Sequence, residues 1–323
     1  MINSLTTWWR MTLRMPDIRR TLAFIMCVGL VVGLPCLLQA EEIAILKSAD
    51  ISAYTEAIEG FKSHLPPSAN IILEYDLQGD MAKGRNLARR IRASDAKVVL
   101  AVGLKAALAA KLEILDIPVI YCLVLDPDKY GLPSGNMVGL TLDLPFKDQV
   151  KPLKTLLPKA SRFGVLFDPQ KTGGMVKQLE REAKSLGITI FTHEVQAEQD
   201  IPTALKTLPA DIDALWLLPD STVLTENSLD FLMSWTLERH IPVLGFSAGL
   251  VKSGALVATY LHYADTGHQA ATLAKDLMQN AKSPVLGTSV MPDTVHRSVN
   301  QKTATYLGLS LTPESLRQFD ERF

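Results

Sequence analysis

Small polar and acidic side chains recur where short apolar segments of the sequence end and helical patterns begin. Hydroxyl and carboxylate groups at such positions can cap a helix, and the free backbone N–H groups of a helix N-terminus attract carboxylates and phosphates. This chemistry suits the noncovalent binding of a small polar ligand. The residues that share this placement are Ser48, Asp50, Gly103, Asp168, Thr172, Asp220, Ser221, Thr222 and Ser247.

One of these residues also lies in a motif for covalent chemistry. Residues 245–249 read G-F-S-A-G after a predicted strand, which is the context of a serine hydrolase nucleophile, here Ser247. An acid and a base follow in the required order, as Asp265 with His268 or as Asp293 with His296. Against this, the first pair falls within one predicted helix, and no HGGG-like segment precedes the motif. A secreted serine hydrolase therefore stands as an alternative function.

The elements that must position these residues alternate along the chain. Four- to six-residue runs rich in Val, Ile, Leu and aromatic residues predict buried parallel strands, and amphipathic segments between them predict helices. This alternation predicts an α/β fold with doubly wound, Rossmann-like parallel sheets. The strands are expected at residues 43–46, 71–75, 98–102, 119–124, 163–167, 188–192, 214–218, 243–246 and 255–259, and the helices at 53–64, 82–93, 104–113, 171–186, 222–239 and 263–280.

The alternation is interrupted between residues 125 and 160, where Pro, Gly, Asn and Asp concentrate. We interpret this segment as the first crossing between two lobes. In open α/β sheets ligands bind beyond the carboxyl ends of the strands. The loops expected to converge there are residues 47–50, 103–105, 125–127, 168–172 and 219–222, together with 247–249.

The N-terminus has the pattern of an export signal. Four arginines and one acid occur in residues 1–20, residues 21–38 carry no charge, and Leu38-Gln39-Ala40 precedes Glu41-Glu42. We expect residues 1–40 to be a signal peptide cleaved after Ala40, with an uncleaved anchor or a lipoprotein as alternatives. Cleavage would leave Cys122 as the remaining cysteine, so no intramolecular disulfide could form.

Composition excludes several other classes of protein. The 323 residues are 47% hydrophobic and 21% charged, with a formal net charge of −1, which argues against a disordered chain and a basic nucleic-acid binder. The chain has no G-x-G-x-x-G or Walker motif, and its six histidines lack metal-ligand spacing. We therefore expect no cofactor, no metal and no nucleic-acid partner.

An ordered set of short motifs resembles one family along essentially the whole exported chain. They include Ile117-Pro118-Val119, Asp126-Pro127, Leu217-Leu218-Pro219-Asp220 and, further on, Ile241-Pro242-Val243, Gln269-Ala270-Ala271 and Leu307-Gly308-Leu309. Their order resembles the periplasmic solute-binding proteins of ABC importers, in the subfamily linked to tryptophan and tyrosine uptake.

The resemblance implies two lobes joined by a multi-strand hinge that close on one ligand without covalent chemistry. Residues 41–141 and about 256–290 would form the first lobe, and about 142–255 and 291–323 the second. Asp220, Ser221 and Thr222 would be the main ligand contacts of the second lobe, and the loops around Ser48 and Gly103 those of the first, with Asp126 near the hinge.

The function implied is capture of a small polar solute in the periplasm for an ABC permease of the inner membrane. Because apolar burial of an aromatic side chain supplies about 4–6 kcal/mol and micromolar affinity needs about 8, charge-assisted hydrogen bonds must supply the rest. We therefore expect an amino acid, with an aromatic one as a candidate, bound by a monomer that is not an enzyme. A ligand-binding module for a membrane sensor would have the same sequence features.

Overall fold

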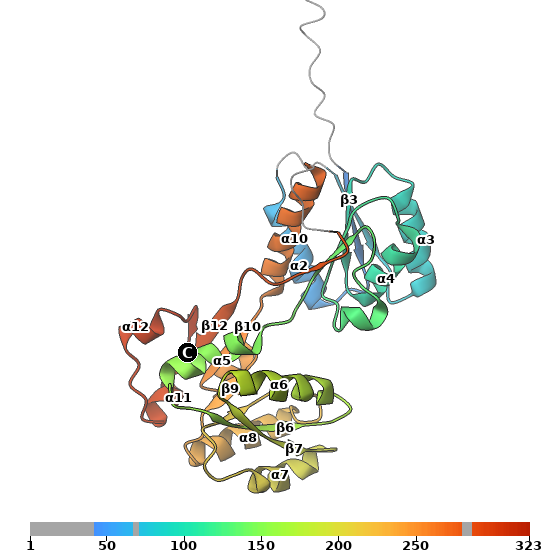
Figure 1. Cartoon of the computed structure of the whole chain (residues 1–323). Helices are drawn as coiled ribbons and strands as arrows, with labels where there is room; N and C mark the ends of the chain where they lie inside the picture. Colours follow the sequence, from blue (N-terminus) through green and yellow to red (C-terminus); the bar gives the residue numbers. More distant parts are fainter. Residues whose placement is uncertain (1–41, 67–70, 280–285) are drawn as a thin grey trace, which may run out of the picture. The chain divides into compact units, whose positions relative to one another are not determined.

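The computed structural model describes residues 42–66, 71–279 and 286–323, which form two α/β lobes (Figure 1). The six strands of the first sheet follow the order β11-β5-β4-β3-β1-β2, and every pairing is parallel. The predicted signal peptide lies outside the described residues. The strands are β1 (Glu42–Lys47), β2 (Ile71–Asp76), β3 (Val98–Val102), β4 (Val119–Cys122), β5 (Met137–Leu140) and β11 (Ser289–Val290).

The second sheet has the order β13-β12-β10-β9-β8-β6-β7. It departs from the predicted parallel pattern at β12, which runs antiparallel to β10. Between β10 and β12 the chain passes through α10 and β11 of the first lobe, and it re-enters the second sheet at the end where β10 leaves it, so that His296 pairs with Tyr260 and the two strands run in opposite directions. Its strands are β6 (Arg162–Phe167), β7 (Thr189–Glu194), β8 (Ala214–Trp216), β9 (Val243–Gly245), β10 (Val257–Tyr260), β12 (His296–Val299) and β13 (Glu321–Arg322).

Helices cover both faces of the first sheet, as expected for parallel strands buried on both sides. Ile43 and Ile45 of β1 pack toward α2 (Ser52–His64) and α10 (Tyr263–Met278). Ala44 and Leu46, which alternate with them, pack toward α3 (Met81–Arg92) and α4 (Leu104–Glu113). The short helix η1 (Pro127–Tyr130) follows β4.

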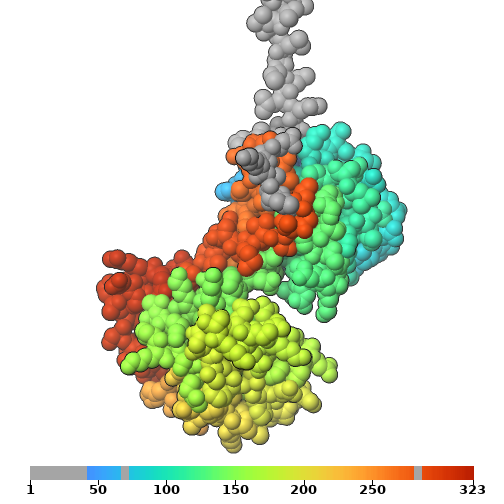
Figure 2. Space-filling view, viewed as in Figure 1, coloured from blue at the N-terminus to red at the C-terminus, as the bar shows by residue number. Residues whose placement is uncertain are grey.

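The second sheet is covered in the same way. The helices α5 (Phe146–Leu156), α6 (Gly173–Ser185) and α11 (Gln301–Tyr306) pack on one face, and α7 (Ile201–Thr207), α8 (Glu226–Glu238) and α9 (Ala248–Lys252) on the other. η2 (Glu198–Asp200) precedes α7, and the residues around α12 (Pro313–Leu316) lie beside α5 (Figure 2), where the Thr155 hydroxyl donates to the Gln318 amide oxygen at 3.1 Å. Among the described helices, none combines the length and the apolar character needed to cross a bilayer.

Three segments connect the two sheets, and we call them the first, second and third crossing segments: residues 141–145, 261–262 and 291–295. The predicted return to the first lobe near residue 256 is wrong for β10, because this strand hydrogen-bonds to β9 and β12 in the second sheet. The interruption expected at 125–160 also contains regular structure, namely β5 and α5. Helix α5 fits between Pro145 and Pro158 because Pro145 precedes its first turn, where a missing N–H costs nothing.

Helix α10 returns the chain to the first lobe and packs against α2 at backbone distance. A Cβ atom built on Gly267 would lie 2.0 Å from the carbonyl oxygen of Ala57, and one on Gly60 would lie 2.2 Å from that of Ala264. These glycines have helical backbones, so the constraint on them is space rather than conformation. The contact fixes the first turn of α10, and with it the end of the second crossing segment.

Replacing Gly267 with Ala should lower the melting temperature by roughly 3–10 °C, because the new methyl group overlaps the α2 backbone and overpacking costs about 1–3 kcal/mol. Differential scanning calorimetry measures this change. Gly174→Ala is the matched control, since no heavy atom lies within 4 Å of a Cβ atom built there in α6. An equal loss in both variants would contradict the role given to the helix contact.

Candidate functional site

Ser48 and Gly103 meet at the start of α4 and hold the first lobe together. The Ser48 hydroxyl donates to the Val102 carbonyl at 3.0 Å and accepts from the Ala106 N–H at 2.9 Å, so it caps α4 from another loop. Gly103 has a φ of +84°, and a Cβ there would lie 2.8 Å from the Ser48 hydroxyl. These two loops therefore meet, and the Ser48 hydroxyl is used in hydrogen bonds within the lobe.

Asp220 is the centre of a closed hydrogen-bond cluster that joins the loops after β6 and β8. Its Oδ2 accepts from the Asp168 N–H at 2.8 Å and the Thr172 hydroxyl at 2.5 Å, and its Oδ1 from the Thr222 and Val223 N–H groups at 2.9 and 3.2 Å. The side chain is 1% exposed. Four internal donors saturate this carboxylate, so it has little capacity left for a ligand ammonium group.

Asp168 belongs to the same cluster. The Thr222 hydroxyl donates to its Oδ2 at 2.7 Å and the Gln170 N–H to its Oδ1 at 2.8 Å, and these bonds lower the pKa of the Asp168 carboxyl.

The turn around Asp220 also affects where α8 begins. This helix begins at Glu226, with Thr225 as its N-cap, and not at the predicted residue 222. The reason is that residues 222–224 form the turn that binds Asp220.

The remaining predicted residues lie apart from this cluster. Asp50 is exposed and pairs with Lys47 at 3.0 Å, and α2 begins at Ser52 with no side-chain cap. Asp126 is exposed before η1 with a left-handed φ of +46°, and Ser221 is exposed in the Asp220 turn. None of these three positions caps a helix through its side chain.

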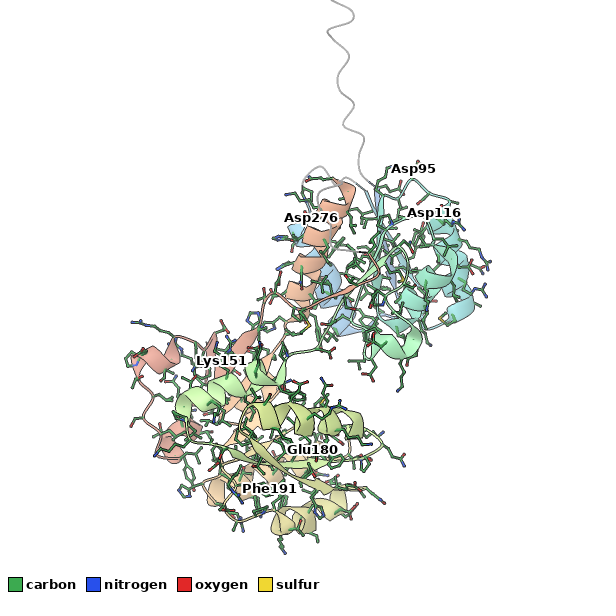
Figure 3. All side chains as sticks on the ribbon, viewed as in Figure 1. Asp95, Asp116, Lys151, Glu180, Phe191 and Asp276 are labelled. Atoms are coloured by element: carbon green, nitrogen blue, oxygen red, sulfur yellow. The ribbon has the colours of Figure 1, made fainter. Side chains whose placement is uncertain are left out.

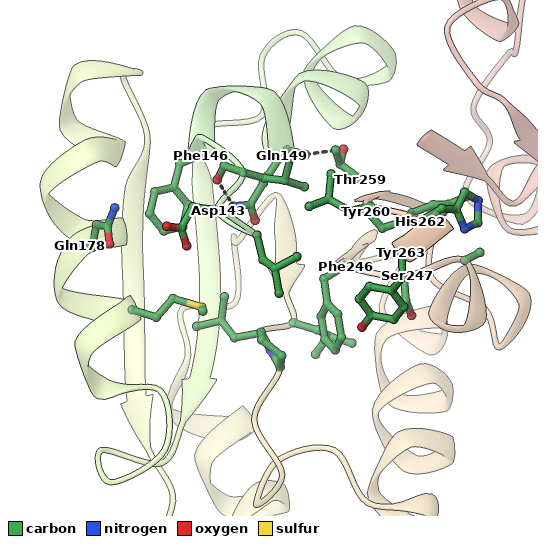
Figure 4. Close-up of a pocket in the computed structure, with 18 of the residues that line it drawn as sticks. Asp143, Phe146, Gln149, Gln178, Phe246, Ser247, Thr259, Tyr260, His262 and Tyr263 are labelled. Carbon is green, nitrogen blue, oxygen red and sulfur yellow. Dashed lines mark hydrogen bonds between the residues drawn. The ribbon is translucent and has the colours of Figure 1, made fainter. Parts of the chain in front are cut away.

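A cavity of about 550 Å³ lies where the crossing segments approach the second sheet (Figure 4). Of the ten predicted ligand residues, Ser247 is the one that lines it. Phe146, Phe246 and Tyr263 supply aromatic surface. The other lining residues are Glu56, Leu142, Asp143, Leu144, Gln149, Met175, Gln178, Leu217, Leu218, Pro219, Ala248, Thr259, Tyr260, Leu261 and His262.

The Asp143 carboxylate lines this cavity without a hydrogen-bond or ion-pair partner among the described residues. Asp143 is an exposed residue, and solvent reaches it. Partial desolvation, with added repulsion from Asp126 and Asp128, raises the pKa of its carboxyl group. A cation placed beside it would relieve both effects.

Sequence reasoning missed Asp143 because it lies in the first crossing segment, which carried no helix-start signal. The available clue was a single acid in the apolar run Leu142-Asp143-Leu144, directly before Pro145 and a helix. Gln149 was missed for a related reason, since it belongs to the unpredicted helix α5. Its side-chain amide donates to the Leu144 carbonyl at 2.7 Å and so fixes the segment that carries Asp143.

The geometry does not assemble the alternative hydrolase site. The Ser247 hydroxyl accepts from the Leu250 N–H at 3.3 Å and caps α9. His268 instead lies 3.3 Å from the Ser63 hydroxyl, while Asp265 pairs with His296. Within the described residues, no histidine contacts Ser247.

Comparison with known families shows which proteins this chain resembles. The family model described as ABC transporter substrate binding protein matches residues 42–321. A protein of Clostridioides difficile (strain R20291) named tyrosine-binding protein is 26% identical over 219 residues, which cover 65% of this chain and 63% of that protein. The match thus spans less than two thirds of this relative. An uncharacterized protein of Rickettsia prowazekii (strain Madrid E) is 20% identical over 287 residues, which cover 86% of this chain and 91% of that protein.

Solved structures share the fold. A ligand-free, open structure of a substrate binding protein with adhesive properties from Clostridium difficile matches with a TM-score of 0.73 and 21% identity, over 87% of this chain and 98% of that one. An ABC domain in complex with L-Trp, from Streptococcus pneumonia, matches with a TM-score of 0.58 and 20% identity, over 88% and 100% of the two chains. The predicted two-lobe α/β architecture is confirmed by these likenesses.

Asp220→Asn should destabilise the second lobe by about 2–3 kcal/mol. Four groups now donate hydrogen bonds to the Asp220 carboxylate, and the NH₂ group of Asn would face two of them without being able to accept. Urea unfolding measures the change. Asp211→Asn is the control, because Asp211 is exposed and pairs with Arg162 at the surface, and it should change stability by less than about 0.5 kcal/mol. Equal stability of the two variants would show that Asp220 is not the structural centre described.

Proposed function

The chain belongs to the ABC transporter substrate binding protein family, and from this premise we propose that it captures an aromatic amino acid for an importer. Proteins of this family act outside the cytoplasm and bind small molecules for ABC permeases. For this chain we propose in addition that residues 1–40 direct export to the periplasm and that a permease of the inner membrane receives the ligand. The names of two relatives support the ligand class, since one is called a tyrosine-binding protein and another holds L-Trp.

The unpaired Asp143 carboxylate in an aromatic-lined cavity is the observation that carries this proposal. An α-ammonium group bound there makes a charge-assisted hydrogen bond and removes the repulsion among Asp143, Asp126 and Asp128. We therefore assign the binding of the ammonium group to Asp143 and not to Asp220, because four groups of the protein itself already donate hydrogen bonds to Asp220.

Aromatic surface in the cavity supports an aromatic ligand side chain. Phe146 is buried, while Phe246 is half-buried and Tyr263 is 37% exposed, so the last two keep surface available for contact. Ring pairs contribute about 0.5–1.5 kcal/mol beyond the burial of area. Burial of the ligand ring at about 4–6 kcal/mol then needs a charged contact to reach micromolar affinity.

The N-terminus of α6 supports binding of the ligand carboxylate. The Thr172 hydroxyl donates to Asp220, so no side chain caps this thirteen-residue helix. Met175 and Gln178, in its first two turns, line the cavity. The first backbone N–H groups of α6 are therefore free to bind an anion.

Exposed apolar residues at the ends of strands support lobe closure. Ile51 and Leu125 follow β1 and β4 and are 48% and 75% exposed, and Met175, in the first turn of α6, is 39% exposed. Of these three side chains, Met175 lines the cavity. Closure of the lobes over the ligand would bury them and present a new surface to the permease.

Asp143→Asn should weaken binding of L-tyrosine or L-tryptophan about 10- to 100-fold, because it removes the charge opposite the ammonium group. Isothermal titration calorimetry measures the affinity. Asp148→Asn is the matched control, since Asp148 lies five residues further on and does not line the cavity. An unchanged affinity in Asp143→Asn would refute the proposed contact.

The same contact predicts a pH dependence. Because the pKa of Asp143 is raised, its carboxyl group protonates earlier on acidification than an ordinary aspartate, and the ammonium group then loses its partner. Affinity should be full at neutral pH and decline as the pH falls through this raised pKa. Titrations of Asp143→Asn should lack this component of the decline, and a decline of equal size in the variant would contradict the assignment.

A further inference from the structure

Three of the six histidines gather where the second and third crossing segments lie side by side. His262 lies in the second crossing segment, His268 on α10 and His296 at the start of β12. Asp265 and Glu321 are the acids that contact them. We name these five residues the hinge histidine cluster.

Asp265 is shared between two imidazoles. Its Oδ2 lies 2.5 Å from Nε2 of His296, and its Oδ1 lies 3.5 Å from Nδ1 of His268. His268 also contacts the Ser63 hydroxyl at 3.3 Å and faces the His64 ring at 5.2 Å. The carboxylate therefore links α10, which packs on the first lobe, to β12, which belongs to the second sheet.

His262 extends the cluster toward the ligand cavity. Its ring lies edge-on to that of His296, with 4.3 Å between centroids, and its Nε2 lies 3.6 Å from Oε1 of Glu321. The same Glu321 oxygen accepts from the Tyr260 hydroxyl at 2.7 Å. His262 also lines the cavity, so the cluster connects the crossing segments with the binding site.

Histidine is the residue type whose charge ordinarily changes between about pH 5 and 8, so a cluster of histidines and acids can respond to protons in this range. With neutral imidazoles its two carboxylates give the cluster a charge of −2, and each proton gained by a histidine adds one positive charge. Other titratable groups face it from the elements packed around it: Tyr260 of β10, His64 and Glu56 of α2, and Asp320, which accepts from the Arg297 N–H beside His296. Tyr260 remains a neutral donor because burial raises the pKa of its hydroxyl.

We propose that the hinge histidine cluster is a proton-linked lock on the crossing between the lobes. Protonation of His296 converts its hydrogen bond to Asp265 into a charge-assisted pair, which is the stronger kind of bond. Acidification therefore stabilises the arrangement of α10 and β12 seen here against any arrangement in which they move apart. Since binding couplings are reciprocal, ligand affinity then depends on pH through these residues, a consequence that rests on the proposed function.

Distances between the lobes in the protein without added ligand test this lock. Asp116 and Glu180 are exposed on the first and second lobes (Figure 3), and cysteines introduced there accept spin labels. Cys27 and Cys36, in residues 1–40, are replaced by Ser so that they take no label, and Cys122 should not react, because it is fully buried and burial raises the pKa of its thiol to about 12. Double electron–electron resonance spectroscopy then measures the distribution of distances between the two spin labels at about pH 8 and at about pH 5.

Acidification should narrow this distribution in the parent protein and in His240→Gln, whose histidine stacks on Tyr306 away from the cluster. His296→Gln should show the same distribution at both pH values. Asp265→Asn, which keeps a side chain of the same shape, should also lose the response. A parent protein without a pH response, or variants that respond as the parent does, would overturn the lock.

The test separates the lock from the proposed function. Calorimetry of the parent protein with L-tyrosine and L-tryptophan reports ligand capture independently of the label distances. If neither amino acid binds while the distances respond to pH through His296, the lock stands and the proposed ligand class fails. If an amino acid binds and the distances ignore pH, the lock fails and the ligand proposal stands.

Discussion

The backbone contact between α2 and α10 is the constraint on which the functional part of the molecule depends. Gly267 leaves no space for a side chain against the α2 backbone, so the first turn of α10 has a fixed place on the first lobe. That turn carries Tyr263, which lines the cavity, and Asp265, which binds His296. This contact between small residues thus positions both an aromatic wall of the cavity and the shared acid of the hinge histidine cluster.

Two aspartates illustrate how burial and hydrogen bonding assign opposite roles to the same side chain. Asp220 is buried and accepts four internal donors, and the free energy of those bonds holds two loops together. Asp143 has no described partner and a raised pKa. A carboxylate saturated by internal donors stabilises the fold, whereas an exposed one without a protein partner can accept a hydrogen bond from a ligand.

Much of the fold follows from periodicity, because buried strands and amphipathic helices have distinct patterns. Helix α4 was predicted at its observed bounds, Leu104–Glu113, and β6 to within one residue. The site was harder to predict, since Ser, Thr and Asp after strands serve the loops themselves: Ser48 caps α4, and Thr172 and Thr222 bind the Asp220 cluster. Asp143 could not be recognised because a residue's lack of partners is a tertiary property that no local pattern encodes.

The proposed function requires the cavity to recognise the ammonium group of an aromatic amino acid through Asp143. Thermal melting with L-tryptophan and with N-acetyl-L-tryptophan, which has the same ring and carboxylate but no ammonium group, tests it most directly. At 100 times its dissociation constant a ligand adds about 2.7 kcal/mol, so L-tryptophan should raise the melting temperature by several degrees and the acetylated compound should not. Equal shifts with both compounds, or a shift with the acetylated compound alone, would contradict the account.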